Sequence, residues 1–85
     1  MTNMEILNEP VDVIASMDAE GYFRPQSLTW RRKKFSIVSV GRQWDEEQGR
    51  GVLVEAADGT RFELLLRRED LSWRIKKIWW GQIVA

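Results

Sequence analysis

The chain has 85 residues, with 13 basic and 13 acidic side chains and no cysteine or histidine. This composition excludes disulfides, thiolate chemistry and the usual zinc ligand sets, so packing alone must stabilise a thin core. We therefore expect no metal and no cofactor. No apolar run of ~18 residues occurs, which predicts no membrane span, and the lack of cysteine favours a cytoplasmic protein.

The net charge of zero conceals an uneven distribution. Residues 1–23 contain five acids and no base, whereas residues 24–85 contain all 13 bases and the other eight acids, a net charge of +5. Charge asymmetry of this kind can accompany a contact with nucleic acid or a membrane. The simpler interpretation is that the acidic stretch lies across a basic face of the same domain.

In the N-terminal third of the chain, the sequence pattern predicts a tail followed by one strand. Residues 1–8 are expected to form the tail and residues 9–85 a single β domain, with the alternative that Met4, Ile6 and Leu7 add an edge strand or a short helix. Residues 11–16 show the two-residue alternation of a half-buried strand. Residues 17–21 have the composition of a turn, and the segment before Pro25 is expected to be extended, because a residue that precedes proline avoids the helical region.

Two strands follow, joined by the four cations Arg31-Arg32-Lys33-Lys34. A two-residue turn at Arg32-Lys33 would require positive φ values, for which Arg and Lys are poorly suited. A four-residue turn over all four cations avoids that strain. Both turns predict the same cross-strand pairs: Trp30 with Phe35, and Leu28 with Ile37.

After a polar loop over residues 45–51, residues 52–66 contain a second hairpin whose register can be derived. A two-residue turn at Asp58-Gly59 would place Glu55 opposite Phe62. A three-residue loop over residues 57–59 pairs apolar with apolar side chains and acid with base, and it places glycine where a positive φ is needed. We therefore predict the three-residue loop, with the pairs Val54–Phe62, Val52–Leu64 and Glu55–Arg61.

The last stretch, residues 72–80, fits two kinds of element. Trp73 and Ile75 alternate with basic residues as in a strand, but the apolar spacing also fits a helix, which leaves open an α+β fold with a C-terminal helix over residues 70–80. Trp and Ile favour strands, so we predict a strand. The fold class is then all-β, a small antiparallel barrel of five to six strands, with an SH3-like barrel preferred to an OB-type barrel.

We predict that the protein is not an enzyme. Nucleophile–base pairs built on histidine or cysteine are excluded. The acid pairs Glu46-Glu47 and Glu69-Asp70 are expected in exposed loops, whereas a carboxyl group that acts as a general acid needs burial. Gly49-Arg50-Gly51 is too short to cradle a phosphate. No catalytic or metal-binding residue is assigned.

Basic and aromatic residues are the candidate binding groups, because cations follow a nucleic-acid backbone and exposed rings stack on bases. Adjacent residues of a strand point to opposite faces, so one of Trp79 and Trp80 is expected to be largely exposed. Trp30 and Trp73 are expected in the core. The candidate partner-binding aromatic residues are Trp44, Trp79 and Trp80, and the candidate nucleic-acid contacts are Arg31, Arg32, Lys33, Lys34, Arg67, Arg68, Arg74, Lys76 and Lys77.

Aromatic and turn residues recur in a recognisable order over residues 9–80: Glu9-Pro10-Val11, Leu28-x-Trp30-Arg31, Phe35-x-Ile37, Trp44, Val54-x-Ala56, Gly59-x-Arg61-Phe62-x-Leu64 and Trp73. This order resembles a small bacterial β-domain family of unknown function. Similar segments end the catalytically inactive Y-family polymerase-like proteins of induced mutagenesis. Two positions depart from the pattern, since Arg32 replaces a glycine of the first hairpin and Leu65-Leu66-Arg67 replaces a Phe-Arg pair.

The resemblance implies a β domain that docks onto protein or DNA in a repair setting, and it implies no activity. We therefore expect a non-enzymatic interaction module, monomeric or weakly dimeric, that binds a protein partner and no membrane. The alternative is a nucleic-acid-binding module that uses the basic clusters at residues 31–34, 67–68 and 74–77.

Overall fold

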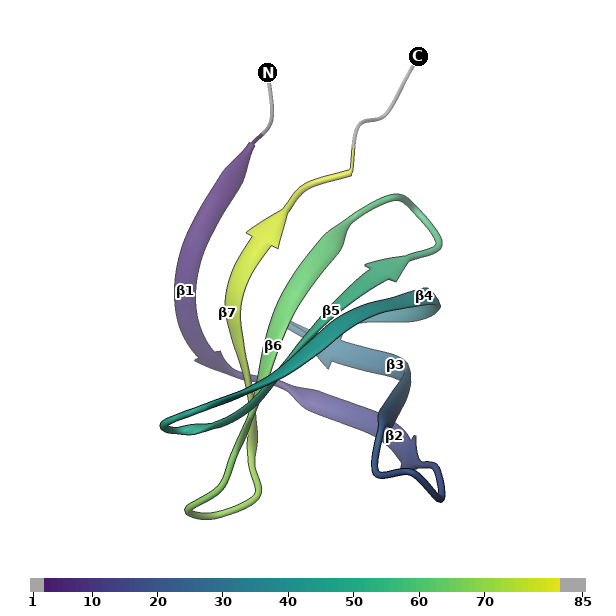
Figure 1. Cartoon of the computed structure of the whole chain (residues 1–85). Helices are drawn as coiled ribbons and strands as arrows, with labels where there is room; N and C mark the ends of the chain where they lie inside the picture. Colours follow the sequence, from purple (N-terminus) through teal and green to yellow (C-terminus); the bar gives the residue numbers. More distant parts are fainter. Residues whose placement is uncertain (1–2, 82–85) are drawn as a thin grey trace.

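The computed structural model describes residues 3–81, which form one antiparallel sheet of seven strands that does not close (Figure 1). The all-β prediction is confirmed. The predicted barrel of five to six strands, SH3-like or otherwise, is wrong. The described part of the chain contains no helix long and apolar enough to cross a membrane. The strands are β1 (Met4–Pro10), β2 (Asp12–Met17), β3 (Phe23–Trp30), β4 (Lys33–Glu46), β5 (Gly49–Ala56), β6 (Arg61–Arg67) and β7 (Trp73–Trp79), in the spatial order β1-β7-β6-β5-β4-β3-β2.

The two edges of the sheet are β1 and β2, which are neighbours in the chain and are separated by Val11 alone. β1 pairs with β7 and β2 pairs with β3. Pro10 has no N–H to continue a ladder, and the Val11 N–H instead donates to the Trp73 carbonyl at 3.2 Å. One run of residues is therefore divided between two ladders, and residues 4–8 belong to an edge strand rather than to the expected tail.

β4 folds the sheet back on itself. Residues 33–36 pair with β3, and residues 37–46 pair with β5. The register of β4 with β5 shifts twice, between Ile37 and Ser39 and again between Val40 and Gln43. Such bulges bend a strand and increase its twist. β2 and β3 are thereby brought across the inner face of β5, β6 and β7 (Figure 1).

The first hairpin has a tighter turn than predicted. Arg31 and Arg32 form a two-residue turn at φ values of 52° and 67°, and Leu28 pairs with Phe35 while Trp30 pairs with Lys33. The predicted pairs are therefore shifted by two residues. Because side chains alternate with a period of two, this shift keeps the same residues on the inner face.

The second hairpin has the predicted register: Val54 pairs with Phe62, Val52 with Leu64 and Glu55 with Arg61. The three-residue loop is also confirmed, since the Ala56 N–H donates to the Thr60 carbonyl and Gly59 has a φ of 90°.

The strand prediction for the last stretch is confirmed, and the helix alternative over residues 70–80 is excluded by β7. Its simple alternation is interrupted, however. Leu64 pairs with Ile75 and Glu63 with Lys77, so Lys76 is an extra, bulged residue. The bulge lets Ile75 and Ile78, three residues apart, both face the core.

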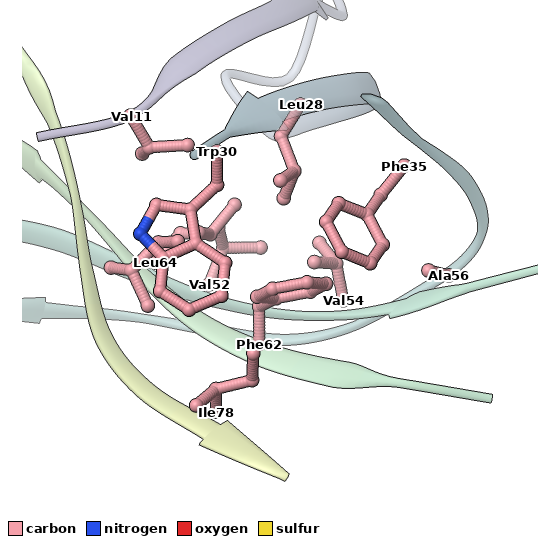
Figure 2. Close-up of a cluster of buried hydrophobic side chains, with 11 residues drawn as sticks. Val11, Leu28, Trp30, Phe35, Val52, Val54, Ala56, Phe62, Leu64 and Ile78 are labelled. Atoms are coloured by element: carbon pink, nitrogen blue, oxygen red, sulfur yellow. The ribbon is translucent and has the colours of Figure 1, made fainter. Parts of the chain in front are cut away.

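The core lies between the two halves of the folded sheet. Leu28 and Trp30 of β3 face Phe62 of β6 and Ile78 of β7 (Figure 2). The rings of Phe35 and Phe62 meet edge to face, with 5.0 Å between their centroids. Aromatic burial of this kind supplies much of the stability available to a small domain without disulfides.

Candidate interaction surface

The opposite face of the sheet, here called the outer face, consists of three rows of residues that run across β1, β7, β6 and β5, and two of the rows continue onto β4. The ladder pairs define each row, because paired residues point to the same side of a sheet. The first row is Met4, Trp79, Arg61, Glu55 and Ser39, the second is Ile6, Lys77, Glu63 and Leu53, and the third is Pro10, Arg74, Leu65, Gly51 and Trp44.

Trp79 lies in an open groove of about 620 Å³ at the end of β7. Leu53 and Gly41 line the groove from β5 and β4, and Arg61 and Glu55 lie between them and Trp79. Arg61 Nε and Glu55 Oε1 are 3.3 Å apart in a largely exposed ion pair. Exposed ion pairs contribute little stability, so both side chains can be redirected towards a ligand at low cost.

Trp44 is fixed at the other end of the outer face. Its ring lies over Gly51, where a Cβ atom would come within 2.3 Å of the ring carbons. The indole N–H donates to Glu46 Oε2 at 2.8 Å, and the Arg42 guanidinium lies 5.3 Å from the ring centroid. Leu65, the partner of Gly51 on β6, is 1% exposed. Trp44 is therefore held in place over Gly51, and only part of its ring remains accessible to a partner.

Trp80 points to the inner side, opposite to Trp79, as the strand alternation predicts. Its ring packs against Trp30 with 5.7 Å between centroids, and its indole N–H donates to Glu5 Oε1 at 3.0 Å. Trp79 and Trp80 are both half-buried. The prediction that one of them is largely exposed is therefore wrong, because the neighbouring strands shield the flank of each ring.

The four cations of the first hairpin lie at the β3–β4 turn. Arg31 Nη2 is 2.9 Å from Glu9 Oε2, and its guanidinium lies 4.3 Å from the centre of the Trp30 ring. The hydrogen bond from Arg31, followed by that from the Trp30 indole, lowers the pKa of Glu9 below its ordinary value of 4.5. Lys33 lies over Phe35, whereas Arg32 and Lys34 form no ion pair with any residue in the described range 3–81.

The other candidate cations are engaged elsewhere. Arg67, Arg68 and Arg74 lie around one shallow hollow, together with Glu47 and Glu69. Their partners are close: Arg67 bonds to Glu69 at 2.9 Å, Arg68 donates to the carbonyl oxygens of Glu46 and Glu47, and Arg74 donates to that of Asn8. Lys77 lies 3.9 Å from Glu63 on the outer face, and Lys76 is the bulged residue.

The nine predicted nucleic-acid contacts are therefore divided among three places and do not form one basic surface. The acidic N-terminal segment compensates part of the charge, through the ion pairs Glu9–Arg31 and Asp18–Arg24. In residues 3–81 no group of three or more acidic side chains is arranged to hold a metal ion.

Sequence reasoning missed Met4, Leu53, Glu55 and Arg61 as members of the surface around Trp79. The predicted register of the second hairpin already placed Glu55 opposite Arg61. The alignment of Trp79 with that pair depends on the bulge at Lys76, which no sequence pattern indicated.

Comparison of the chain with protein-family models, with curated proteins and with solved structures gives no match in any of the three.

Proposed function

We propose that the protein is a non-enzymatic interaction module that binds a partner protein through the outer face, with Trp79 as the anchor. The observation that carries the proposal is the first row, in which Met4, Trp79 and Arg61 are adjacent across three strands. Trp, Arg and Met are enriched at protein interfaces, and Trp and Arg dominate their binding energy. The resemblance given above would place this activity in a DNA repair or mutagenesis setting.

The geometry of the groove supports a protein ligand. Trp79 and Leu53 offer apolar area, and the Arg61–Glu55 pair offers both a donor and an acceptor at its rim. A site with an apolar centre and a small number of polar groups is typical of specific recognition. Nucleic acid would instead require several cations without neighbouring acids beside the ring, and the carboxylates of Glu55 and Glu63, which lie beside Arg61 and Lys77, would repel phosphate.

A second candidate function, nucleic-acid binding, rests on the β3–β4 turn. Arg32 and Lys34 have no acidic partner within residues 3–81, and the turn projects four cations in succession. The ion pair of Arg31 with Glu9 and the dispersal of the other cations weigh against it.

The test is affinity capture from an extract of the source organism, with the wild type compared with Arg61→Glu and Trp79→Ser. Arg61→Glu places an acid opposite Glu55 at an exposed position and should leave the fold intact. It therefore still reports on binding if Trp79→Ser lowers the stability of the protein. Leu71→Ser, which changes an exposed apolar residue of the β6–β7 turn, is the matched control.

We expect a protein that is captured by the wild type and by Leu71→Ser, and lost with both outer-face variants, after nuclease treatment and at moderate salt. Capture that persists with Arg61→Glu and Trp79→Ser would place the site elsewhere. Capture that disappears with nuclease or with salt would favour the nucleic-acid alternative, because phosphate contacts release counterions.

A further inference from the structure

β2 is an edge strand with one side unoccupied. Its ladder with β3 covers all six residues, Asp12–Met17, and no other strand within residues 3–81 pairs with it. It lies at the lower rim of the molecule in Figure 1. An edge of this kind presents a row of free N–H and C=O groups, which natural proteins protect with charges, prolines or bulges.

The other edge, β1, carries such protection. It contains Glu5, Glu9 and Pro10, and its register with β7 shifts between Ile6 and Glu9. Each of these features disfavours the addition of a further strand.

β2 lacks all of these devices between its ends. It has no proline, and no charged residue lies between Asp12 and Asp18. The irregularity in its ladder falls on β3, because Ile14 pairs with Ser27 and Ala15 with Pro25, which leaves Gln26 as the extra residue. Val13 packs against the core, but two other apolar side chains of β2 are uncovered, with Ile14 61% and Met17 58% exposed.

The charges around β2 indicate what would pair with it. Asp12 begins the strand, and Asp18 and Glu20 follow its end. Asp18 is engaged with Arg24 at 3.3 Å, whereas Asp12 and Glu20 form no ion pair in the described range. A second copy paired antiparallel about the centre of β2 would bring Asp12 of one chain beside Asp18 of the other, and like charges at that distance repel.

We infer that β2 is a strand-addition site, separate from the outer-face anchor, that takes an extended segment of another protein. The segment has β-branched or aromatic residues at its centre and Lys or Arg at both ends. Backbone hydrogen bonds to β2 supply affinity, as in other cases of β-strand addition. The flanking cations meet Asp12 at one end and Glu20 at the other.

The test is a selection of random peptides of about ten residues, long enough to cover β2 and its flanks, on the immobilised protein. Ile14→Lys introduces a protective charge into the edge, and Val38→Lys is the matched control, because Val38 is 64% exposed on the interior strand β4 and belongs to none of the outer-face rows. Cooperative unfolding of both variants is verified first. We expect the selected peptides to have basic ends and to bind Ile14→Lys at least about tenfold more weakly, while Val38→Lys retains binding. Amide hydrogen exchange of residues 12–17 should slow in the complex.

Three results would overturn the inference. Selected peptides that bind Ile14→Lys as well as they bind the wild type would not use this edge, and binding that leaves amide exchange in β2 unchanged would not add a strand. If the protein dimerises with rising concentration and Ile14→Lys abolishes the dimer, the occupant is a second copy and not another protein.

Discussion

Arg31 and Arg32 adopt left-handed backbone conformations in the β3–β4 turn, with φ values of 52° and 67°. Two-residue hairpin turns favour Asn-Gly because both positions need a positive φ. A non-glycine residue in this region costs about 1–2 kcal/mol. Two of the four cations are therefore placed on a turn that their backbones do not favour, and the sequence prediction of a longer turn followed from that same strain.

Replacement of Arg32 by glycine should raise the free energy of unfolding by about 1 kcal/mol, because it relieves the positive φ and removes no ion pair. Lys34→Gly removes a cation from the same hairpin at a β4 position and should lower stability by about 0.5–1 kcal/mol. Urea denaturation of the three proteins distinguishes strain from charge. If both variants raise the free energy of unfolding, charge repulsion rather than backbone strain dominates the turn, and if both lower it, the positive φ of Arg32 is not a source of strain.

At the scale of an element, β5 contributes one side to the core and the other side to the outer face. Val54 faces the core opposite Phe62 and is 3% exposed, whereas Leu53 lies on the outer face opposite Glu63. Consecutive residues of one strand thus serve stability and the proposed binding surface.

Val54→Asp should abolish cooperative folding, because an unpaired charge beside Phe62 costs more than a small domain can lose. Leu53→Asp should remain folded, with a loss of about 1–2 kcal/mol for the half-buried apolar area. Circular dichroism during thermal unfolding measures both. A folded Val54→Asp protein together with an unfolded Leu53→Asp protein would mean that the two faces of β5 are interchanged.

At the scale of the whole molecule, four carboxylates accept hydrogen bonds within turns or between segments that are distant in the chain. The pKa values of Glu9, Asp18, Asp58 and Asp70 are all lowered, in each case chiefly by hydrogen bonds to the carboxylate. A lowered pKa means that the folded state binds protons more weakly than the unfolded state. These acids therefore stabilise the fold above the ordinary pKa, and that stability is lost as the pH falls through the folded pKa.

Asp58 provides the test, since the Thr60 N–H donates to its Oδ1 at 3.0 Å within the β5–β6 loop and is the first cause of its lowered pKa. The urea midpoint of the wild type should fall between about pH 5 and pH 2. The fall should be smaller for Asp58→Asn, because the amide oxygen can still accept the bond but has no charge to lose. If the urea midpoint falls equally in the two proteins, the protonation of Asp58 does not contribute to the loss of stability at low pH.

The sequence by itself determined the local structure. Alternation predicted the strand after Val11 and the strand character of residues 72–80, and the pairing of apolar with apolar and acid with base predicted the register of the second hairpin. These features follow from interactions between residues close in the chain, where side-chain period and turn chemistry agree.

Only the tertiary structure decided where the sheet ends and which residues share its outer face. Pro10 and Val11 divide one run between the two edges, so that no barrel closes, and residues 4–8 gain strand structure only by pairing with the distant β7. The bulge at Lys76 aligns Trp79 with Arg61 and Met4 while Ile75 and Ile78 both stay in the core. Bulges and edges depend on contacts between residues far apart in the chain, which leave no period in the sequence.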